Sequence, residues 1–368
     1  MYAREFRDGA KDGLEALEPL DPDKITSFSE LLEAMGKTAF GGRHLGKAFD
    51  VFWAMIEDPD CRVIMTLSGA MTIAKMGKII TKMIDEGMVH CIISTGALMA
   101  HGLSESVGKT HYRHDPSMSD EELFRKGYNR VYDTLEMEAN LNYVEHVVTR
   151  TVKRLNDDRP LSSEVLTREL GKTLAEELDG EGILKSAYLK KVPVYIPAFT
   201  DSEVGLDMGT WAMAREVDRV RSQGGQKDDL AILQTILQSY PSFNPYLDLN
   251  SYADHVLSAK RLGIFTIGGG VPRNWAQQVG PYIEIGNLRL GLSVKPPRFQ
   301  YGVRICPEPD YWGGLSGCTY QEGLSWGKFV TPKDGGQFAE VLSDATVVWP
   351  LLMMGLLERK KAGVVRHS

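Results

Sequence analysis

The sequence is poor in cysteine and has no excess of basic residues. Its four cysteines are scattered and form no Cys-x-x-Cys pair, which argues against a disulfide framework and predicts free thiols in a reducing compartment. Lysine and arginine number 42 against 49 aspartates and glutamates, giving a net charge of −7. Nucleic-acid binding needs concentrated positive charge to neutralise phosphates, so we expect no nucleic-acid partner.

Long apolar runs are also missing. The longest, from Thr346 to Leu357, is too short to cross a bilayer and contains Pro350. The first residues carry charge at Arg4 and Glu5 and lack the apolar core of a signal peptide. These features predict a cytoplasmic protein without membrane contact. The composition, 43% hydrophobic and 25% charged, is that of an ordinary globular chain.

Apolar runs alternate with helical segments from Cys61 onward. An apolar run ending at Ser68-Gly69, a helical stretch over 71–86 and a second apolar run over 88–97 predict a βαβ unit. Because these runs are continuously apolar, the strands should lie in a parallel sheet covered on both faces. Further strands are expected at 191–200, 261–267, 301–306 and 338–342, followed by a helix from Ser343 to Gly363. The predicted fold class is α/β, a doubly wound, mainly parallel Rossmann-like sheet.

The remaining segments are predicted to be helices and loops. Residues 1–60 should form a helical N-terminal extension, with a capping signal at Ser27 and Glu30, and residues 61–363 a single Rossmann-like domain. The charge-rich segment 110–185 should be mostly helical, and residues 224–229 should form a loop.

Small residues follow several of the predicted strands. The cluster Gly268-Gly269-Gly270 could let backbone N–H groups approach a phosphate, but it is not a GxGxxG motif, and three glycines after a strand also make a tight turn. Asp201 at a strand end is suited either to accept ribose hydroxyls or to cap a helix. His111 and His114 lie in a polar segment, where we expect solvated side chains, and the sequence predicts no metal site.

The lysine most suggestive of chemistry is Lys328. It lies between Trp326 and Phe329, where partial desolvation would favour the neutral, nucleophilic amine and therefore imine chemistry. The alternative is a surface lysine beside a core tryptophan, and composition alone favours that alternative.

The motifs in their chain order resemble the deoxyhypusine synthase family, and most closely its bacterial deoxyhypusine synthase-like branch. The resemblance extends from about Phe40 to Lys361. It is carried by Met88-Val89, Ser94-Thr95-Gly96-Ala97, Pro197-Ala-Phe-Thr-Asp201, Gly268-Gly269-Gly270-Val271, Ser325-Trp326-Gly327-Lys328 and Ser343-Asp344-Ala345. The Ser-Trp-Gly-Lys segment is the specific one in this context, whereas the glycine cluster alone is not.

The resemblance implies an NAD-dependent aminobutyl transferase. Family members bind NAD in the α/β domain and form homotetramers with active sites at dimer interfaces. NAD takes a hydride from spermidine, the lysine matched by Lys328 captures the aminobutyl group as an imine with release of 1,3-diaminopropane, and an acceptor amine then displaces the lysine. The donor is spermidine or putrescine, and the acceptor is a protein lysine or a free diamine.

The resemblance also implies particular site residues. The cofactor would be bound by Gly69, Ala70, Met71, Thr72, Ile73, Thr95, Gly96, Ala97, Asp201, Gly269, Asp344 and Ala345. The amine would be contacted by Glu322, Trp326, Ser316, Asn274, His101 and Asp207. A carboxylate suits a cationic amine, and a tryptophan face adds cation–π attraction.

The departures from the family pattern lie mostly on the amine side. The family's acidic pair after the Thr-Gly-Ala turn falls on Ala100 and His101, and its histidine falls on Asn274. Two aspartates fall on Leu315 and Leu206, next to Ser316 and Asp207. Because groups that would hold a polycation are lost, a homospermidine synthase acting on free diamines and a non-catalytic NAD- or polyamine-binding relative remain as alternatives.

Overall fold

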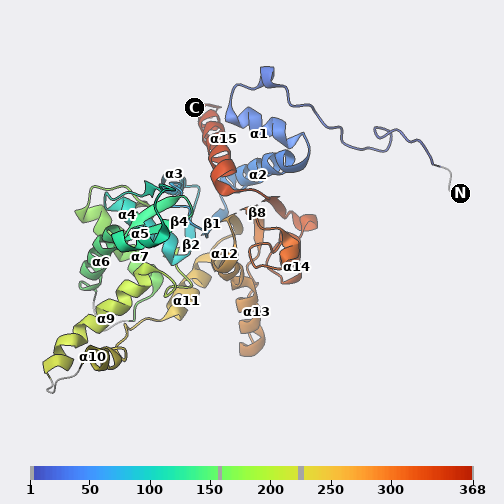
Figure 1. Cartoon of the computed structure of the whole chain (residues 1–368). Helices are drawn as coiled ribbons and strands as arrows, with labels where there is room; N and C mark the ends of the chain where they lie inside the picture. Colours follow the sequence, from blue (N-terminus) through green and yellow to red (C-terminus); the bar gives the residue numbers. More distant parts are fainter. Residues whose placement is uncertain (1–3, 156–159, 223–227, 367–368) are drawn as a thin grey trace.

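The computed structural model describes residues 4–155, 160–222 and 228–366. Its core is a six-stranded, parallel sheet in the order β6-β2-β1-β7-β8-β9 (Figure 1). If only the six strands of this sheet are numbered along the chain, their spatial order is 3-2-1-4-5-6. That is the order of a doubly wound, dinucleotide-binding sheet, and it puts the point where the strand order reverses between β1 and β7. The predicted fold class is confirmed.

The strands and helices of the described residues have the following bounds. The strands are β1 Cys61–Leu67, β2 Cys91–Ser94, β3 Tyr112–Arg113, β4 Tyr128–Val131, β5 Thr134–Met137, β6 Val194–Tyr195, β7 Arg261–Ile267, β8 Phe299–Ile305 and β9 Gln337–Val341. The helices are α1 Phe28–Gly36, α2 Phe40–Glu57, α3 Gly77–Asp85, α4 Gly96–Ser106, α5 Asp120–Lys126, α6 Glu138–Val152, α7 Ser163–Glu177, α8 Ile183–Lys190, α9 Glu203–Ser222, α10 Asp229–Ile236, α11 Pro245–Leu257, α12 Gly270–Gln277, α13 Val279–Leu290, α14 Tyr320–Ser325 and α15 Ala345–Arg366, with short 3-10 turns at Pro22–Lys24, Asp310–Trp312 and Pro332–Asp334.

Both faces of the sheet are buried, which explains why its strands read as continuous apolar runs. In β1, Val63 and Met65 belong to one hydrophobic core, and Ile64 between them belongs to another on the opposite face. Side chains alternate between the faces of a strand, so a strand covered on both sides needs apolar residues throughout. On the first face Phe52 of α2 stacks on Phe265 of β7, with ring centroids 4.4 Å apart.

Helix α1 shows the predicted capping arrangement. The Ser27 hydroxyl accepts a hydrogen bond from the Glu30 amide at 3.2 Å, and the Glu30 carboxylate accepts from the Thr26 amide at 2.7 Å. Regular helix begins only at α1, however, and residues 4–21 are without helix or strand (Figure 1). Within residues 4–60, α-helix is therefore found only from Phe28 onward.

Three local predictions were wrong. The helix predicted from residue 71 begins at Gly77, because 71–75 forms a tight turn in which the Met76 amide bonds to the Met71 carbonyl and Lys75 has a φ of 65°. The strand predicted over 191–200 is confined to Val194–Tyr195. The last helix continues through Gly363, where it was expected to end.

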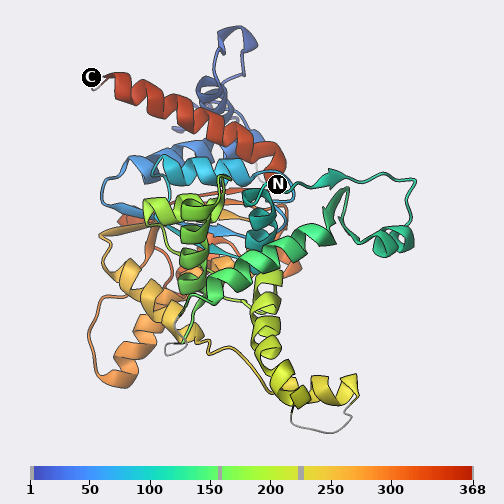
Figure 2. The ribbon, with the colours of Figure 1, turned by 90° about the vertical axis from the view of Figure 1, so that its left-hand side faces the viewer.

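The segment 110–185 contains strands as well as helices. β3, β5 and β4 form a small antiparallel sheet, and Figure 2 shows these strands and α5 projecting from the body of the molecule. The expectation of a mostly helical segment missed this sheet, because its strands are two to four residues long and largely polar. Of the loop predicted at 224–229, residues 224–227 lie outside the described residues.

Candidate active site

The ends of β1 and β7 meet at the edge of the sheet where the strand order reverses. Leu67 and Ile267, the last residues of the two strands, lie opposite each other in the parallel register. Beyond them the Ser68 hydroxyl accepts a hydrogen bond from the Gly269 amide at 2.9 Å. Gly69 and Gly268 each have a φ of 76°, a conformation that favours glycine. The two turns therefore form one glycine-lined edge.

Two helices begin at this edge without a side-chain cap. α4 follows Thr95 and α12 follows Gly269, and neither residue offers a capping hydrogen bond. In contrast, Ser119 caps α5 and Ser162 caps α7. The first N–H groups of an uncapped helix have no intrahelical partner and point at whatever lies beyond the helix, so this edge suits an anion such as a pyrophosphate.

The predicted cofactor residues differ in exposure. Thr72 is buried, and its hydroxyl donates to the Leu98 carbonyl at 2.8 Å. Ile73 and Ala345 are also buried. Asp201 and Asp344 are exposed, and the Asp344 carboxylate accepts from the Thr346 amide at 2.7 Å. Thr72, Ile73 and Ala345 are thus placed to support the edge, whereas the two aspartates face solvent.

The cap of α9 is Ser202 rather than Asp201. The Ser202 hydroxyl accepts from the Gly205 amide at 3.3 Å and donates to the Phe199 carbonyl at 2.9 Å. This hydroxyl also explains Gly96, since a Cβ on Gly96 would lie 2.2 Å from it. The residue that caps this helix is therefore Ser202, and the helix-cap interpretation of Asp201 was wrong.

Lys328 is buried, with 6% of its surface exposed, whereas Trp326 is 61% exposed. The alternative of a surface lysine beside a core tryptophan is therefore wrong on both counts. The Lys328 amine donates to Asn274 Oδ1 at 3.1 Å and lies 5.8 Å from the centroid of the Trp326 ring. The Phe299 amide at the start of β8 bonds to the Lys328 carbonyl at 3.0 Å, which ties the lysine to the sheet.

Burial lowers the pKa of the Lys328 amine below the ordinary lysine value of 10.5. The positive charge of Arg273, which donates to the Cys318 carbonyl at 2.5 Å, acts in the same direction. Cys318 and Glu322 oppose the shift without reversing it. A larger share of the amine is therefore neutral and nucleophilic at neutral pH than for a solvated lysine.

Burying the charged Lys328 amine lowers the free energy of unfolding, and this predicts how the stability of Lys328→Met depends on pH. Between the lowered folded-state pKa and 10.5 the unfolded chain binds more protons, so the free energy of unfolding of the wild type rises with pH across that window. Methionine carries no charge. We therefore expect the stability of Lys328→Met relative to the wild type to be greatest at pH 7–8 and to fall as the pH rises toward 10.5, while the loss of the donor to Asn274 Oδ1 acts equally at every pH.

Urea unfolding of both proteins at several pH values measures this difference, with Lys333→Ala, an exposed lysine on the same segment, as the control. A difference in the free energy of unfolding that does not change with pH would contradict the lowered pKa.

The predicted site residues fall into two groups. Lys328, Asn274, Trp326 and Glu322 lie together around α12 and α14, and Ser316 packs on the glycine edge, since a Cβ on Gly269 would lie 2.5 Å from its Cα. His101 and Asp207 lie on α4 and α9. Figure 1 shows α14 and α9 on opposite sides of the molecule.

The second group contains several carboxylates that are buried or partly buried. Burial, together with the charges of Glu145 and Glu203, raises the pKa of Asp207 to about 7. His101 Nδ1 lies 3.1 Å from Glu136, a buried residue of β5. His111 was expected to be solvated, but it is 6% exposed and lies against the same carboxylate, because the pairing of β3 with β5 brings residues 111 and 136 together.

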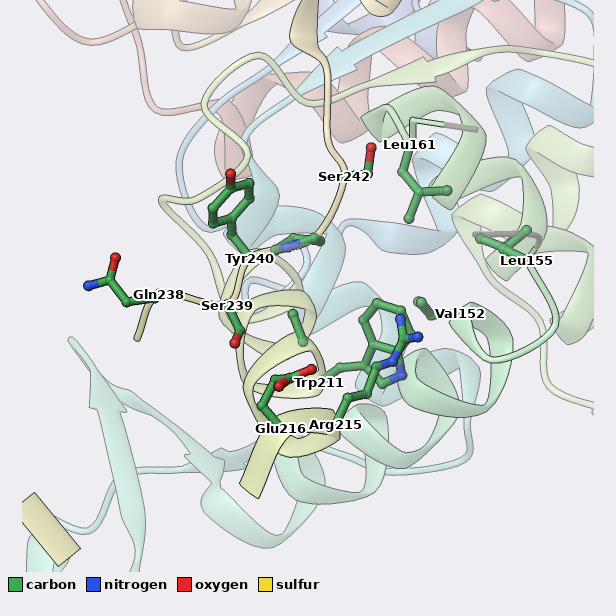
Figure 3. Close-up of a pocket in the computed structure, with 12 residues that line it drawn as sticks. Val152, Leu155, Leu161, Trp211, Arg215, Glu216, Gln238, Ser239, Tyr240 and Ser242 are labelled. Atoms are coloured by element: carbon green, nitrogen blue, oxygen red, sulfur yellow. The ribbon is translucent and has the colours of Figure 1, made fainter. Parts of the chain in front are cut away.

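A separate pocket begins one helical turn beyond Asp207 on α9. It has a volume of about 450 Å³ and is bounded by α6, α9 and residues 238–242 (Figure 3). Trp211 and Arg215 line it, with the Arg215 guanidinium 5.0 Å from the Trp211 ring centroid. None of the predicted site residues is among its described lining residues.

Comparison with known proteins decides the family. The model of the deoxyhypusine synthase family matches residues 30–356, which include the glycine edge and Lys328. The chain belongs to the deoxyhypusine synthase family. This membership confirms the predicted resemblance and the predicted enzyme class, a transferase of aminobutyl groups.

Individual relatives agree with this assignment. The chain is 31% identical over 348 residues to "Probable deoxyhypusine synthase 2" of Methanosarcina acetivorans, covering 93% of this chain and 89% of that protein. It is 28% identical to the "Deoxyhypusine synthase-like protein" of Elusimicrobium minutum, covering 92% and 82%. A solved structure from Entamoeba histolytica, described as a "putative deoxyhypusine synthase", covers 93% of this chain and 97% of that one, with a TM-score of 0.55 at 12% identity, and shares the fold.

Several residues around the site were missed in the sequence. Arg273 and Cys318 both act on the Lys328 amine, and Glu136 binds His101. Arg273 directly precedes the predicted site residue Asn274. That adjacency is the one sequence signal that pointed to Arg273 as a neighbour of Lys328. Glu136 is 35 residues from His101 and gave no signal in spacing or motif.

Proposed function

We propose that the chain is an NAD-dependent aminobutyl transferase that moves the butylamine group of spermidine or putrescine, through an imine on Lys328, to an acceptor amine. The observation that carries the proposal is the burial of the Lys328 amine in a chain of this family. Only a neutral primary amine can attack a substrate imine and then be displaced by a second amine.

The residues at the strand-end edge fit a dinucleotide. A Cβ at Gly69 or Gly270 would meet a single atom at 3.9 Å, from Met71 and Ser316 respectively, and the uncapped starts of α4 and α12 offer free N–H groups. Asp201 and Asp344 are exposed carboxylates suited to ribose hydroxyls. NAD bound there would supply the hydride acceptor and donor for the carbon beside the substrate amine.

The chain's own residues would orient and retain the amine. Asn274 Oδ1 fixes the direction of the Lys328 amine, and the exposed face of Trp326 can bind a cationic chain by cation–π attraction. Glu322, exposed and near enough to Lys328 to raise its pKa, supplies a carboxylate for an ammonium end. By keeping water away from the imine, these residues would also protect it from hydrolysis.

We propose further that the two groups of site residues complete each other across a dimer interface within a homotetramer. The support is their separation onto α12–α14 and α4–α9 and the arrangement that the family implies. Asp207, whose pKa is raised to about 7, would be ionised by an ammonium group brought beside it. Light scattering of the purified chain tests the tetramer.

The acceptor that we favour is a free diamine rather than a protein lysine. Ala100, Asn274 and Leu315 stand where the family has ionisable groups. Fewer side chains therefore remain to bind the ammonium groups of spermidine and to select a protein lysine as the acceptor. Transfer to putrescine would make the chain a homospermidine synthase.

The test is an assay of the purified chain with NAD⁺ and spermidine, with and without putrescine. We expect release of 1,3-diaminopropane and, when putrescine is present, formation of homospermidine. Saturable NAD binding without any 1,3-diaminopropane would favour the non-catalytic alternative, and efficient transfer to a protein lysine alone would contradict the diamine acceptor.

A further inference from the structure

Three side chains from distant parts of the chain converge beneath the antiparallel sheet. His101 belongs to α4, His111 directly precedes β3, and Glu136 belongs to β5. One potential ligand atom of each lies within 4.8 Å of the other two. His101 Nδ1 is 3.1 Å and His111 Nε2 is 2.7 Å from the same oxygen, Oε2 of Glu136. We call these three residues the His–His–Glu cluster.

The Glu136 carboxylate is oriented so that only one oxygen faces the imidazoles. Its Oε1 accepts hydrogen bonds from Asn140 Nδ2 at 2.8 Å and from the Met137 amide at 3.1 Å. Oε2 is thereby left to His101 and His111. A fully buried carboxylate held in this way is set up to bind a cation through a single oxygen.

The His111 imidazole points a buried nitrogen into the cluster without a hydrogen bond. Its side chain is wholly inaccessible to solvent, and Nε2, although close to Glu136, lies outside hydrogen-bonding geometry and has no other partner among the described residues. A buried polar atom without a hydrogen bond carries a free-energy penalty, which a ligand at this point would remove.

Each imidazole has a second carboxylate behind it. Glu203 Oε1 lies 4.0 Å from His101 Nε2, and Glu105 Oε1 lies 3.8 Å from His111 Nδ1. Histidines that bind metals usually present their other ring nitrogen to a carboxylate, which fixes the tautomer and the ring orientation. Glu203 Oε2 is itself buried without a hydrogen bond among the described residues.

The charges around the cluster favour a divalent cation. Glu105, Glu136 and Glu203 bring three negative charges, and Lys75, which bonds to Glu105 Oε1 at 2.5 Å, brings one positive charge. With neutral imidazoles the balance is two negative charges. Lys75 also lies 3.0 Å from His111 Nδ1, so a proton on that nitrogen requires the lysine to turn fully to Glu105.

We propose that the His–His–Glu cluster binds one divalent transition-metal ion, with Zn²⁺ the best match, through His101 Nδ1, His111 Nε2 and Glu136 Oε2. Two imidazoles and one carboxylate are a common zinc ligand set, and a fourth position would hold water. Metal bonds of about 2.0–2.1 Å separate ligand atoms by roughly 3.3 Å, so the 2.7 Å contact would widen slightly on binding.

The ion would fasten the antiparallel sheet to α4, the helix that begins at the glycine edge. It also gives His101 a different role from the amine contact that the family resemblance implies. The competing occupant is a proton. Burial lowers the pKa of His111, but its contacts with Glu105 and Glu136 raise it by more, so the net shift is upward. A protonated His111 would then neutralise the charge of Glu136 without a metal ion.

The experiment measures binding of Zn²⁺ to the full chain after removal of metals with a chelator. We expect one Zn²⁺ per chain by calorimetry and elemental analysis, a melting temperature that rises with Zn²⁺ concentration, and a tetrahedral absorption spectrum when Co²⁺ replaces Zn²⁺. Glu136→Gln and His111→Gln should weaken binding by about 100-fold or more, and Glu203→Gln, which keeps all three ligands, by about 10-fold.

His146→Gln, an exposed histidine on α6, is the matched control and should bind as the wild type does. Glu203→Gln keeps the test informative if the ligand variants fail to fold. Absence of saturable Zn²⁺ binding by the stripped wild type would overturn the proposal and leave a proton as the occupant. Equal affinities of the wild type and Glu136→Gln would overturn it too.

Discussion

Replacing Lys328 with alanine or arginine is expected to reduce aminobutyl transfer by roughly 10⁴-fold or more, the scale on which covalent catalysts lose activity without their nucleophile. Alanine has no amine, and arginine stays protonated at neutral pH and cannot exchange with an imine. Release of 1,3-diaminopropane and formation of the transfer product, both followed by chromatography, measure the loss.

The same variants should keep NAD binding, because Lys328 lies on the α12–α14 side and not among the residues of the glycine edge. Slow formation of NADH from spermidine can persist, since oxidation precedes the lysine step. Lys333→Ala, an exposed lysine five residues away, is the control and should transfer normally. Full transfer activity in Lys328→Arg would rule out a covalent role.

Gly269→Val should reduce the stabilisation of the chain by NAD to about 0.4–1.4 kcal/mol. In the wild type, NAD at about 100 times its dissociation constant should add about 2.7 kcal/mol to the free energy of unfolding. A Cβ at position 269 would lie 2.5 Å from the backbone of Ser316, so the loop that leads to Glu322 must move away from β7. Overpacking of this kind costs about 1–3 kcal/mol and would weaken NAD binding by a factor of about 10–100.

The melting temperature with and without NAD measures the effect. Gly286→Ala is the matched control, because Gly286 lies in α13 with open space around it, and this variant should respond to NAD as the wild type does. If saturating NAD leaves the wild type unchanged, the cofactor assignment fails. If it stabilises Gly269→Val fully, NAD binds elsewhere.

The sequence predicted the sheet well where local pattern and burial agree. β7 has the expected bounds, Arg261–Ile267, because a strand buried on both faces is mostly apolar and so stands out as a run. The final helix was given too early an end, since Gly363 does not stop it. β4 and β5 were missed because they are only four residues long and carry polar residues, so they lack a continuous apolar run.

The positions of the site residues were predicted mostly from the family resemblance and less from the chain's own sequence pattern. The residues next to Lys328 in the sequence suggested desolvation of its amine, and the structure agrees in direction. Its actual neighbours, Asn274 and Arg273, stand more than 50 positions away and are brought to it by α12. The partnership of His101 with His111 and Glu136 likewise depends on tertiary structure alone.

Trapping of the covalent intermediate tests the central claim most directly. Borohydride added while the enzyme turns over NAD⁺ and labelled spermidine reduces an imine to a stable secondary amine, so the label stays on the residue that carried it. The account predicts one labelled peptide, the one containing Lys328, and no label in Lys328→Ala. Label on a different lysine, or transfer without any labelled lysine, would contradict it.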